Sequence, residues 1–314
     1  MLEFLRPGLE VLQTEPDYQR PRDQHGLPGG LVRLSPVRTT VIIPDIHARM
    51  EIVRRVLDIP LALSPDTDTT TPLLTALQQG RAQLVCVGDY VHAEQRAAER
   101  WRLAMQEFLE GFTRHTAMDD EMRESLGTLQ MLAAIKTALP EAVHLLKGNH
   151  ENIRNREGNG NHSFGKFAYE GQMVADYMEQ FYPPEVIETI DQFEQNLPLL
   201  AIGGSFLVSH AEPSRFFMPA EIRDYRENGE VTEGLTWTAN GDAEDGSVAA
   251  MLDSYISSDP GLSSYYFAGH RPVNGRYGTR ADGRLIQLHN PASGIAAVIN
   301  PDQQFDPDQD ILVI

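Results

Sequence analysis

The sequence predicts an α/β domain that contains two β-sheets. In the first half of the chain, short apolar segments of β-forming residues alternate with segments of helical periodicity, a pattern typical of strands joined by helices. In the last third, short apolar segments follow one another with turn residues between them, which is typical of hairpins. These two observations together favour two sheets within one domain.

The first element expected is an irregular N-terminal arm over residues 1–38, because RPRDQHGLPGG (20–30) is rich in turn residues. A single domain is expected over residues 39–314. Its strand candidates are short, apolar and bounded by turn or breaker residues. They are TTVII (39–43), QLVCV (83–87), AVHLL (142–146), LLAI (199–202), SFLVS (205–209), SYYFA (264–268), RLIQL (284–288) and IAAVI (295–299).

Helices are expected between the second and third strand candidates and again before the fourth. Apolar residues recur at i+3/i+4 spacing over residues 97–112 and again over residues 118–133, so each stretch predicts a helix with one apolar face. Two more helices are expected at 166–180 and 184–194, since a proline pair at 183–184 fits a helix start. Near the end of the chain, RADGRL (280–285) predicts the turn of a hairpin.

Composition excludes several classes of protein. The 314 residues include 45 acidic and 26 basic ones, for a net charge of −19, and no block is rich in Lys and Arg. We therefore expect no stable nucleic-acid binding and no attachment to a membrane surface. No stretch approaches the roughly 20 apolar residues of a membrane span. The single cysteine, Cys86, and the lack of a secretory signal favour a cytoplasmic protein.

Polar side chains follow five of the strand candidates at the point where each strand ends. They are Asp45 and His47 in IIPDIHA, Asp89 in VCVGDYVH, Asn149 and His150 in HLLKGNHE, His210 in FLVSHAEPS and His270 in YYFAGHRPV. Ligands of α/β sheets bind at the carboxyl ends of strands, so we expect these side chains to converge. D-x-H, G-D and G-H alone are commonly turns or polar loops, whereas GNHE is more specific, because polar groups directly after a buried strand are costly unless paired. The ordered recurrence of all five motifs favours one joint site.

Without His150, six of these residues remain, and they suit two divalent metal ions. Carboxylate, amide and imidazole donors without a thiolate fit Mn²⁺, Fe or Zn²⁺ better than Ca²⁺ or an iron–sulfur cluster. Six ligands are too many for one catalytic ion with an open position, but they suit two ions about 3.5–4 Å apart that share a carboxylate. Such a pair would acidify a bridging water and stabilise in-line displacement at phosphorus. His144 and His289 lie within or against strand candidates, and we expect both to be hydrogen-bonded structural histidines.

The order D-x-H, G-D-x-x, G-N-H-E/D, H and G-H resembles that of the calcineurin-like metallophosphoesterase superfamily, from about residue 40 to residue 300. The wording of GDYV, LLKGNHE, NLPLLAIGGSFLVSHAEPS, GLTWTANGD and GHRPVNG is most similar to the phosphoprotein phosphatase branch, which also contains the bacterial diadenosine tetraphosphatases. The resemblance implies a four-layer αββα sandwich of two mixed sheets flanked by helices, with two metal ions at one rim. Mn²⁺ is the ion expected first, before Fe or Zn²⁺.

The resemblance also implies a role for each residue. His150 would be the general acid that protonates the leaving oxygen, because its ordinary pKa near 6.5 is close to neutral pH. Asp89 and Asn149 complete the catalytic set with His150. The implied metal ligands are Asp45, His47, Asp89 and His270 for one ion, and Asp89, Asn149, His210 and a second histidine for the other.

Two residues depart from the family pattern G-D-Y-V-D-R-G, which here reads GDYVHAE. His92 replaces the aspartate that supports the general acid, so the cationic form of His150 loses its orienting carboxylate unless Glu94 substitutes. Ala93 replaces an arginine that binds the phosphate. The candidates to contact the phosphate instead are His92, Arg215, Arg223, Arg226 and Arg271, among which Arg223 lies ahead of Trp237 and Arg271 adjoins His270.

The function expected is that of a dimetal-dependent phosphoric ester hydrolase whose metal-bridging hydroxide attacks a phosphomonoester. Its substrate would be a phosphorylated small molecule, a nucleotide or a phosphoprotein. Two alternatives stay open. One is a hydrolase of dinucleoside polyphosphates or other phosphoanhydrides, whose better leaving group depends less on His150. The other is a phosphate-binding scaffold without turnover, although it would have no need of all six metal ligands.

Overall fold

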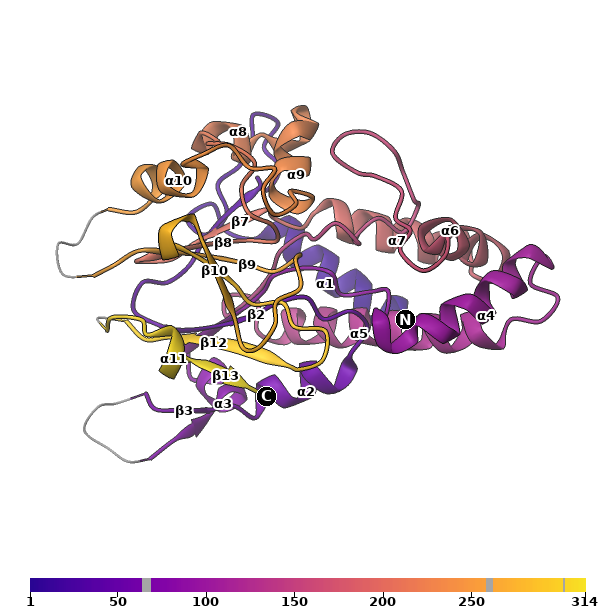
Figure 1. The fold of residues 1–314 in the computed structure, drawn as a ribbon, viewed down its shortest axis with the longest axis horizontal. Coiled ribbons are helices and arrows are strands. Elements are labelled where there is room, and N and C mark those ends of the chain that lie inside the picture. The colour runs from indigo at the N-terminus through magenta and orange to yellow at the C-terminus, as the bar shows by residue number, and fades with distance from the viewer. Residues whose placement is uncertain (64–68, 258–261, 302) are drawn as a thin grey trace.

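Two mixed β-sheets pack face to face between two layers of helices, as the computed structural model shows for residues 1–63, 69–257, 262–301 and 303–314 (Figure 1). The order of strands is β1-β7-β8-β9-β11-β10 in the six-stranded sheet and β13-β12-β2-β5-β6 in the five-stranded sheet. β3 and β4 form a separate pair. The predicted four-layer αββα sandwich is therefore confirmed.

All eight strand candidates form strands, with bounds that shift by at most one residue at either end. The strands of the six-stranded sheet are β1 (Leu31–Arg33), β7 (Leu200–Ile202), β8 (Phe206–Ser209), β9 (Tyr265–Ala268), β11 (Leu285–Gln287) and β10 (Gly278–Arg280). Those of the five-stranded sheet are β13 (Ile311–Val313), β12 (Ile295–Ile299), β2 (Thr39–Ile43), β5 (Ala82–Cys86) and β6 (Val143–Leu145). The short pair is β3 (Pro60–Leu61) and β4 (Thr71–Pro72).

Both faces of each sheet are covered, which explains why the strands are continuously apolar. In β2, Val41 and Ile43 join the helices on the outer face, whereas Ile42 belongs to the core between the sheets. In β8, Val208 faces that same inner core, and Leu207 packs with the outer helices of its own sheet. Successive side chains of a strand point to opposite faces, so two buried faces require apolar residues at every position.

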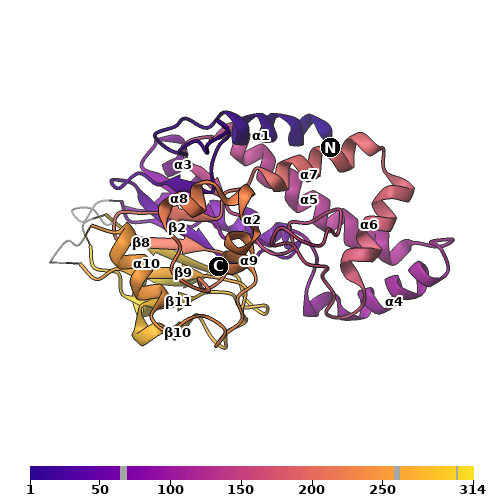
Figure 2. The ribbon, with the colours of Figure 1, turned by 90° about the horizontal axis from the view of Figure 1, so that it is seen from above.

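The helices form two outer layers and one extension. Helices α1 (Leu2–Thr14), α2 (Met50–Leu57), α3 (Leu73–Gln78) and α5 (Thr116–Ala138) belong to the layer on the five-stranded sheet, and α8 (Pro219–Arg223), α9 (Gly229–Thr236) and α10 (Ser247–Tyr255) cover the six-stranded sheet. Helices α4 (Ala98–Leu109), α6 (Glu170–Phe181) and α7 (Pro184–Gln195) continue the first layer, and α4 and α6 lie farthest from the sheets in both views (Figures 1 and 2). The short α11 (Pro307–Asp310) precedes β13.

The expectation of an irregular arm over residues 1–38 is wrong for part of that segment. Leu2–Thr14 form α1, which packs on α5 and α7, and Leu31–Arg33 form the edge strand β1, which pairs parallel with β7. Pro7 and Gly8 lie inside α1 and lower its intrinsic helix propensity. Gly8 is nevertheless the residue that fits there, because a Cβ at this position would lie 3.1 Å from the Cβ of Ala133 in α5. Tertiary packing thus overrides local propensity.

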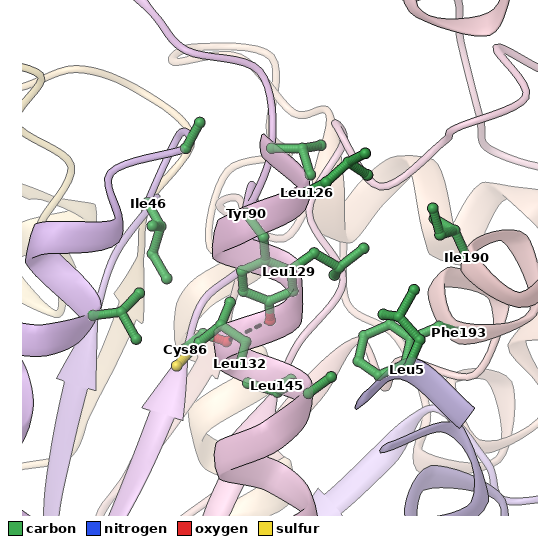
Figure 3. Close-up of a cluster of buried hydrophobic side chains, with 14 of the residues drawn as sticks. Leu5, Ile46, Cys86, Tyr90, Leu126, Leu129, Leu132, Leu145, Ile190 and Phe193 are labelled. Carbon is green, nitrogen blue, oxygen red and sulfur yellow. Dashed lines mark hydrogen bonds between the residues drawn. The ribbon is translucent and has the colours of Figure 1, made fainter. Parts of the chain in front are cut away.

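A buried tyrosine holds the segment after β5 in place. Tyr90 follows Asp89 directly, and its ring packs among Leu126, Leu129 and Leu132 of α5 (Figure 3). Its hydroxyl donates to the carbonyl oxygen of Leu146 at 2.5 Å, at the end of β6. This contact ties together the carboxyl ends of two neighbouring strands. Among the described residues, no helix has the length and the apolar character needed to cross a bilayer.

Candidate metal centre

The polar residues after the strands do converge, because the strands that carry them run parallel within each sheet. Strands β2, β5 and β6 are parallel neighbours in one sheet, and β8, β9 and β11 are parallel neighbours in the other. Their carboxyl ends therefore lie at one edge of each sheet. The two edges meet where Nδ1 of His210 lies 3.9 Å from Oδ1 of Asp45.

One group of donors surrounds the amide oxygen of Asn149. Nε2 of His210 lies 2.9 Å from that oxygen, and Nδ1 of His270 lies 3.0 Å from it. Asp89 joins the group through its Oδ2, which is 3.4 Å from Nε2 of His210. One ligand atom each from Asp89, His210 and His270 fits within a spread of 4.8 Å, a spacing that could hold a metal ion.

A second group forms around the imidazole of His47. Its Nε2 lies 3.6 Å from Oδ2 of Asp89 and 3.9 Å from Oδ2 of Asp45. The same Oδ2 of Asp89 faces both groups, since it also contacts His210. Asp89 is therefore placed as a shared carboxylate between two candidate metal positions.

The grouping of His270 differs from the expectation. The sequence placed it with Asp45 and His47, but its side chain contacts Asn149, and only its backbone N–H donates to Asp45, at 2.9 Å. The reason is the close approach at Gly269, where a Cβ would overlap Oδ1 of Asp45. The chain therefore passes directly beside Asp45 before the His270 side chain turns toward the other group. His270 is the second histidine that the Asn149 group lacked in the sequence prediction.

Backbone contacts hold the donors in position. Nδ1 of His47 hydrogen-bonds with the carbonyl oxygen of His92 at 2.9 Å, and Nδ1 of His210 with that of Val87 at 3.2 Å, which directs Nε2 of each ring toward the other donors of its group. His47, Asp89 and His270 have φ of 46°, 51° and 60°. Such left-handed conformations are costly for residues other than glycine and cluster at functional sites.

Glu151 fixes the loop that carries Asp89. Its carboxylate accepts hydrogen bonds from the backbone N–H groups of Asp89, Tyr90 and Gly148, at 2.8, 2.8 and 2.7 Å. Burial, and then the charge of Asp89, raise the pKa of Glu151 to about 7. The glutamate of the GNHE motif thus helps to position Asp89, a role that was not predicted from the sequence.

The electrostatics of the centre favour cations. Burial alone would raise the pKa of Asp89, but His150, His210 and His47 hold it well below its usual range. Burial would lower the pKa of His210, but Asp89 and Asp45 raise it to about 9. For His270, burial and the neighbouring His210 lower the pKa to about 3, so this imidazole is neutral and ready to bind a metal. A metal ion must displace the proton of His210, so its binding weakens as the pH falls.

These residues fit a pair of divalent metal ions. The donors are oxygens and imidazole nitrogens, and Asp45, His47, Asp89 and His210 are at most 3% exposed. Asp45 and Asp89 bring two buried carboxylates to one place. Buried charges are normally paired or coordinate metals, so a bound cation is a physical explanation for their burial.

His150 and His92 face each other beside the metal centre. Their Nδ1 atoms are 3.2 Å apart, and Phe164 packs against both rings. Burial lowers the pKa of His92 to about 3 and that of His150 well below its usual value, so one neutral ring donates to the other. His92 therefore occupies the place of the orienting aspartate, rather than facing open space where a phosphate could bind. Nε2 of His150 points toward Asp89 at 3.8 Å.

Among the candidate arginines, only Arg271 keeps an available guanidinium. The other three have carboxylate partners: Arg215 with Glu221 (2.9 Å), Arg223 with Asp224 (2.7 Å) and Arg226 with Asp23 (3.2 Å). Within residues 1–63, 69–257, 262–301 and 303–314, Arg271 has no ion pair, and its Nε is buried without a hydrogen-bond partner.

The two remaining strand histidines differ in their partners. His144 in β6 hydrogen-bonds with Gln19 through Nδ1 at 3.3 Å, which confirms the expectation of a structural histidine there. Nε2 of His289, after β11, lies 3.0 Å from Oε2 of Glu94. Nδ1 of His289 lies 3.5 Å from Oδ2 of Asp45. His289 directly follows the strand candidate RLIQL, so the strand-end pattern of the other candidate residues is present there too.

Comparison with known proteins gives one family and several similar folds. The family model for calcineurin-like phosphoesterases matches residues 38–299. No curated protein matches the chain. A protein serine/threonine phosphatase from Saccharomyces cerevisiae superimposes with a TM-score of 0.57 at 13% identity, covering 99% of this chain and 87% of that one. The cold-active protein-tyrosine phosphatase of a psychrophilic Shewanella superimposes with a TM-score of 0.53 at 12% identity, covering 97% and 84%.

Proposed function

This chain belongs to the calcineurin-like phosphoesterase family, and on that premise we propose that it hydrolyses phosphomonoesters with two divalent metal ions. The observation that carries the proposal is the placement of Asp89 between two groups of buried oxygen and nitrogen donors. A shared carboxylate at such a position is what a two-metal phosphoesterase requires.

We assign the proposed ligands to the two ions according to the two groups of donors. Asp45, His47 and Asp89 would hold the first ion, and Asp89, Asn149, His210 and His270 the second. When bound, the ions would activate a water for in-line attack and stabilise charge on the phosphoryl oxygens. We expect Mn²⁺ at both positions, with Fe or Zn²⁺ as alternatives, because the donors are oxygens and imidazoles.

His150 is the proposed general acid for the leaving oxygen. Its position beside Asp89 and its hydrogen bond with His92 support this role, because they fix one ring nitrogen and direct the other toward the metal centre. His92 is a weaker partner than a carboxylate, since a neutral imidazole does not stabilise the imidazolium form. Proton donation by His150 should therefore limit the rate for esters with poor leaving groups.

Arg271 is the proposed phosphate-binding residue. It adjoins the ligand His270, and its guanidinium has no carboxylate partner in the described residues. Arginine can bind phosphoryl oxygens through paired N–H groups. This residue would replace the arginine that the family pattern has at the position of Ala93.

A second candidate function is the hydrolysis of phosphoanhydrides such as dinucleoside polyphosphates. The paired neutral imidazoles of His92 and His150 favour it, because the phosphate leaving group of an anhydride needs little help from an acid.

One substrate panel tests both candidates. Turnover would be measured with Mn²⁺ on aryl phosphates whose phenols differ in pKa, on a phosphopeptide and on diadenosine tetraphosphate. We expect rates that fall steeply as the phenol pKa rises, because His150 is poorly supported. A preference for the anhydride would identify the second candidate. If the metal-loaded protein binds phosphate but hydrolyses none of these at any pH, it is a scaffold and not an enzyme.

A further inference from the structure

The two proposed metal positions differ in the side chains assigned to them. Asp89, Asn149, His210 and His270 are the proposed ligands of the second position. Asp45, His47 and Asp89 are those of the first, beside which lies Nε2 of the proposed general acid His150. Two further side chains, His289 and Glu94, point into this smaller group.

His289 follows the carboxyl end of a strand, as the other proposed ligands do. It lies two residues after β11, which runs parallel beside β9, the strand that carries His270. Its side chain is fully buried, and its ring centroid is 5.4 Å from that of His47. One atom each of Asp45, His47 and His289 fits within a spread of 4.8 Å.

Both ring nitrogens of His289 face carboxylate oxygens. Nδ1 lies 3.5 Å from Oδ2 of Asp45, and Nε2 lies 3.0 Å from Oε2 of Glu94. Neither nitrogen has another partner within the described ranges, so this buried ring lies between two carboxylates. Imidazole and carboxylate groups together are the donors that a divalent transition-metal ion binds.

Glu94 brings a carboxylate to a place where the family pattern has none. In GDYVHAE it stands where G-D-Y-V-D-R-G has its last glycine. Its Oε1 lies 3.5 Å from Nε2 of His47 and 3.4 Å from Nζ of Lys166, and its Oε2 is buried without a hydrogen bond among the described residues. Nε2 of His47 is therefore within 4 Å of three carboxylates, those of Asp45, Asp89 and Glu94.

We propose that His289 and Glu94 are ligands of the first metal ion, in addition to Asp45, His47 and Asp89. The inference rests on the proposed dimetal function and adds two residues to its first position. Three carboxylates would then face the first ion and one the second. Because oxygen donors with negative charge favour hard cations, the first position should bind Mn²⁺ more tightly and fill before the second.

A metal titration tests the assignment without reference to activity. The protein, stripped with a chelator, would be titrated with Mn²⁺ by calorimetry, and the spin coupling between two bound Mn²⁺ ions would be followed by electron paramagnetic resonance. We expect the wild type to bind two equivalents as a coupled pair. In His289→Gln, the affinity of the tighter site should fall at least about tenfold, and the coupled signal should be lost at two equivalents.

Two further variants make the result specific. His144→Gln is the matched control, because His144 is also a buried strand histidine but hydrogen-bonds with Gln19, so it should keep both sites. Glu94→Gln, on a partly exposed side chain, should weaken the same site as His289→Gln, and it decides the question if His289→Gln fails to fold.

The inference is overturned if His289→Gln and Glu94→Gln, or whichever of the two folds, bind two Mn²⁺ ions with wild-type affinity. His289 would then be a protonated partner of Asp45 and Glu94, as its raised pKa in the metal-free protein allows. That result would leave the dimetal phosphoesterase intact. By contrast, a wild-type protein that binds no Mn²⁺ at all contradicts the proposed function itself.

Discussion

Asp89 is the central residue of the proposed metal centre, since its Oδ2 faces both groups of donors. Asp89→Asn keeps the size of the side chain but removes the charge that attracts two cations. We expect it to lose at least one metal equivalent and to reduce turnover by three orders of magnitude or more, on the order of the loss of a principal catalytic group. Metal content is measured by elemental analysis, with the exposed Asp17→Asn as the control. Full metal content in Asp89→Asn would refute the bridging role.

His150 offers a test that separates proton transfer from metal binding. We expect His150→Ala to lower turnover of esters with poor leaving groups about 10²–10⁴-fold, the usual contribution of general acid catalysis. Metal content should be unchanged, because all the proposed ligands remain. The measurement is kcat across aryl phosphates of rising phenol pKa. Equal rates for the variant and the wild type on the poorest leaving group would exclude the role.

His92→Asp restores the carboxylate of the family pattern beside His150. The 3.2 Å contact between the two Nδ1 atoms would become a carboxylate–imidazole contact, which stabilises the imidazolium form. We therefore expect faster turnover of alkyl phosphates, by about tenfold, and little change for aryl phosphates with acidic phenols. His92→Asn, which lacks the charge, is the matched control and should give no gain. A uniform effect on all substrates would contradict the orienting role.

At the residue scale, the strand-end pattern identified six of the eight proposed ligands from sequence, and the structure brings these six close together. The pattern was not applied to His289, which follows the strand candidate RLIQL and was expected to be a structural histidine. The grouping of His270 could not be predicted either, because it depends on the close approach between Gly269 and Asp45, which belong to different sheets. The proposed roles of His92 and Glu94 likewise could be inferred only from their contacts in the folded protein.

At the scale of elements, the docking of α1 depends on a buried ion cluster at its C-terminal end. Glu15 ion-pairs with Lys136 of α5 at 2.6 Å and with Arg20 at 2.9 Å, and none of the three side chains is more than 3% exposed. Burial would raise the pKa of Glu15, but Lys136 and Arg20 lower it. Burial also lowers the pKa of Lys136. The lowered pKa of Glu15 favours its charged form, whereas the lowered pKa of Lys136 disfavours its charged form. The pocket therefore stabilises the charge of the carboxylate, which has two cationic partners.

Glu15→Gln should therefore destabilise the protein in a way that depends on pH. Removing one partner of a buried ion pair costs about 3–5 kcal/mol, because the remaining charges stay buried. Since the pKa of Glu15 is lower in the folded state, its contribution to stability is present above its ordinary pKa of 4.5 and is lost as the pH falls below that value. Urea unfolding of the variant and the wild type at neutral and acidic pH measures this. If the difference in the free energy of unfolding between wild type and variant grew toward acidic pH, the predicted direction of the pH dependence would be wrong.

Long or strongly patterned elements could be predicted from sequence, but short ones could not. All eight strand candidates were found, because a buried strand is a short apolar run between breakers, and the long α5 has clear periodicity. The hairpin of β10 and β11 at RADGRL is also confirmed. Helices such as α2, α3 and α8 have eight residues or fewer, too few to establish a period. The helix α1 was missed because its internal proline and glycine are tolerated only through packing on α5.

At the scale of the whole molecule, the site exists because two separate sheets end at a common edge. Strands β2, β5 and β6 supply Asp45, His47, Asp89 and Asn149, and strands β8 and β9 supply His210 and His270. Sequence could assign each residue to the end of a strand. The order of strands and the stacking of the two sheets decide which residues meet, and both depend on contacts between segments far apart in the chain.

The most direct test of the account is an anomalous diffraction measurement on crystals soaked in Mn²⁺. We predict two peaks about 3.5–4 Å apart on either side of Asp89. One peak should lie among Asp45, His47 and Asp89, and the other among Asn149, His210 and His270. A single peak, or no peak with these side chains turned away from one another, would contradict the central claim that this edge holds two metal ions.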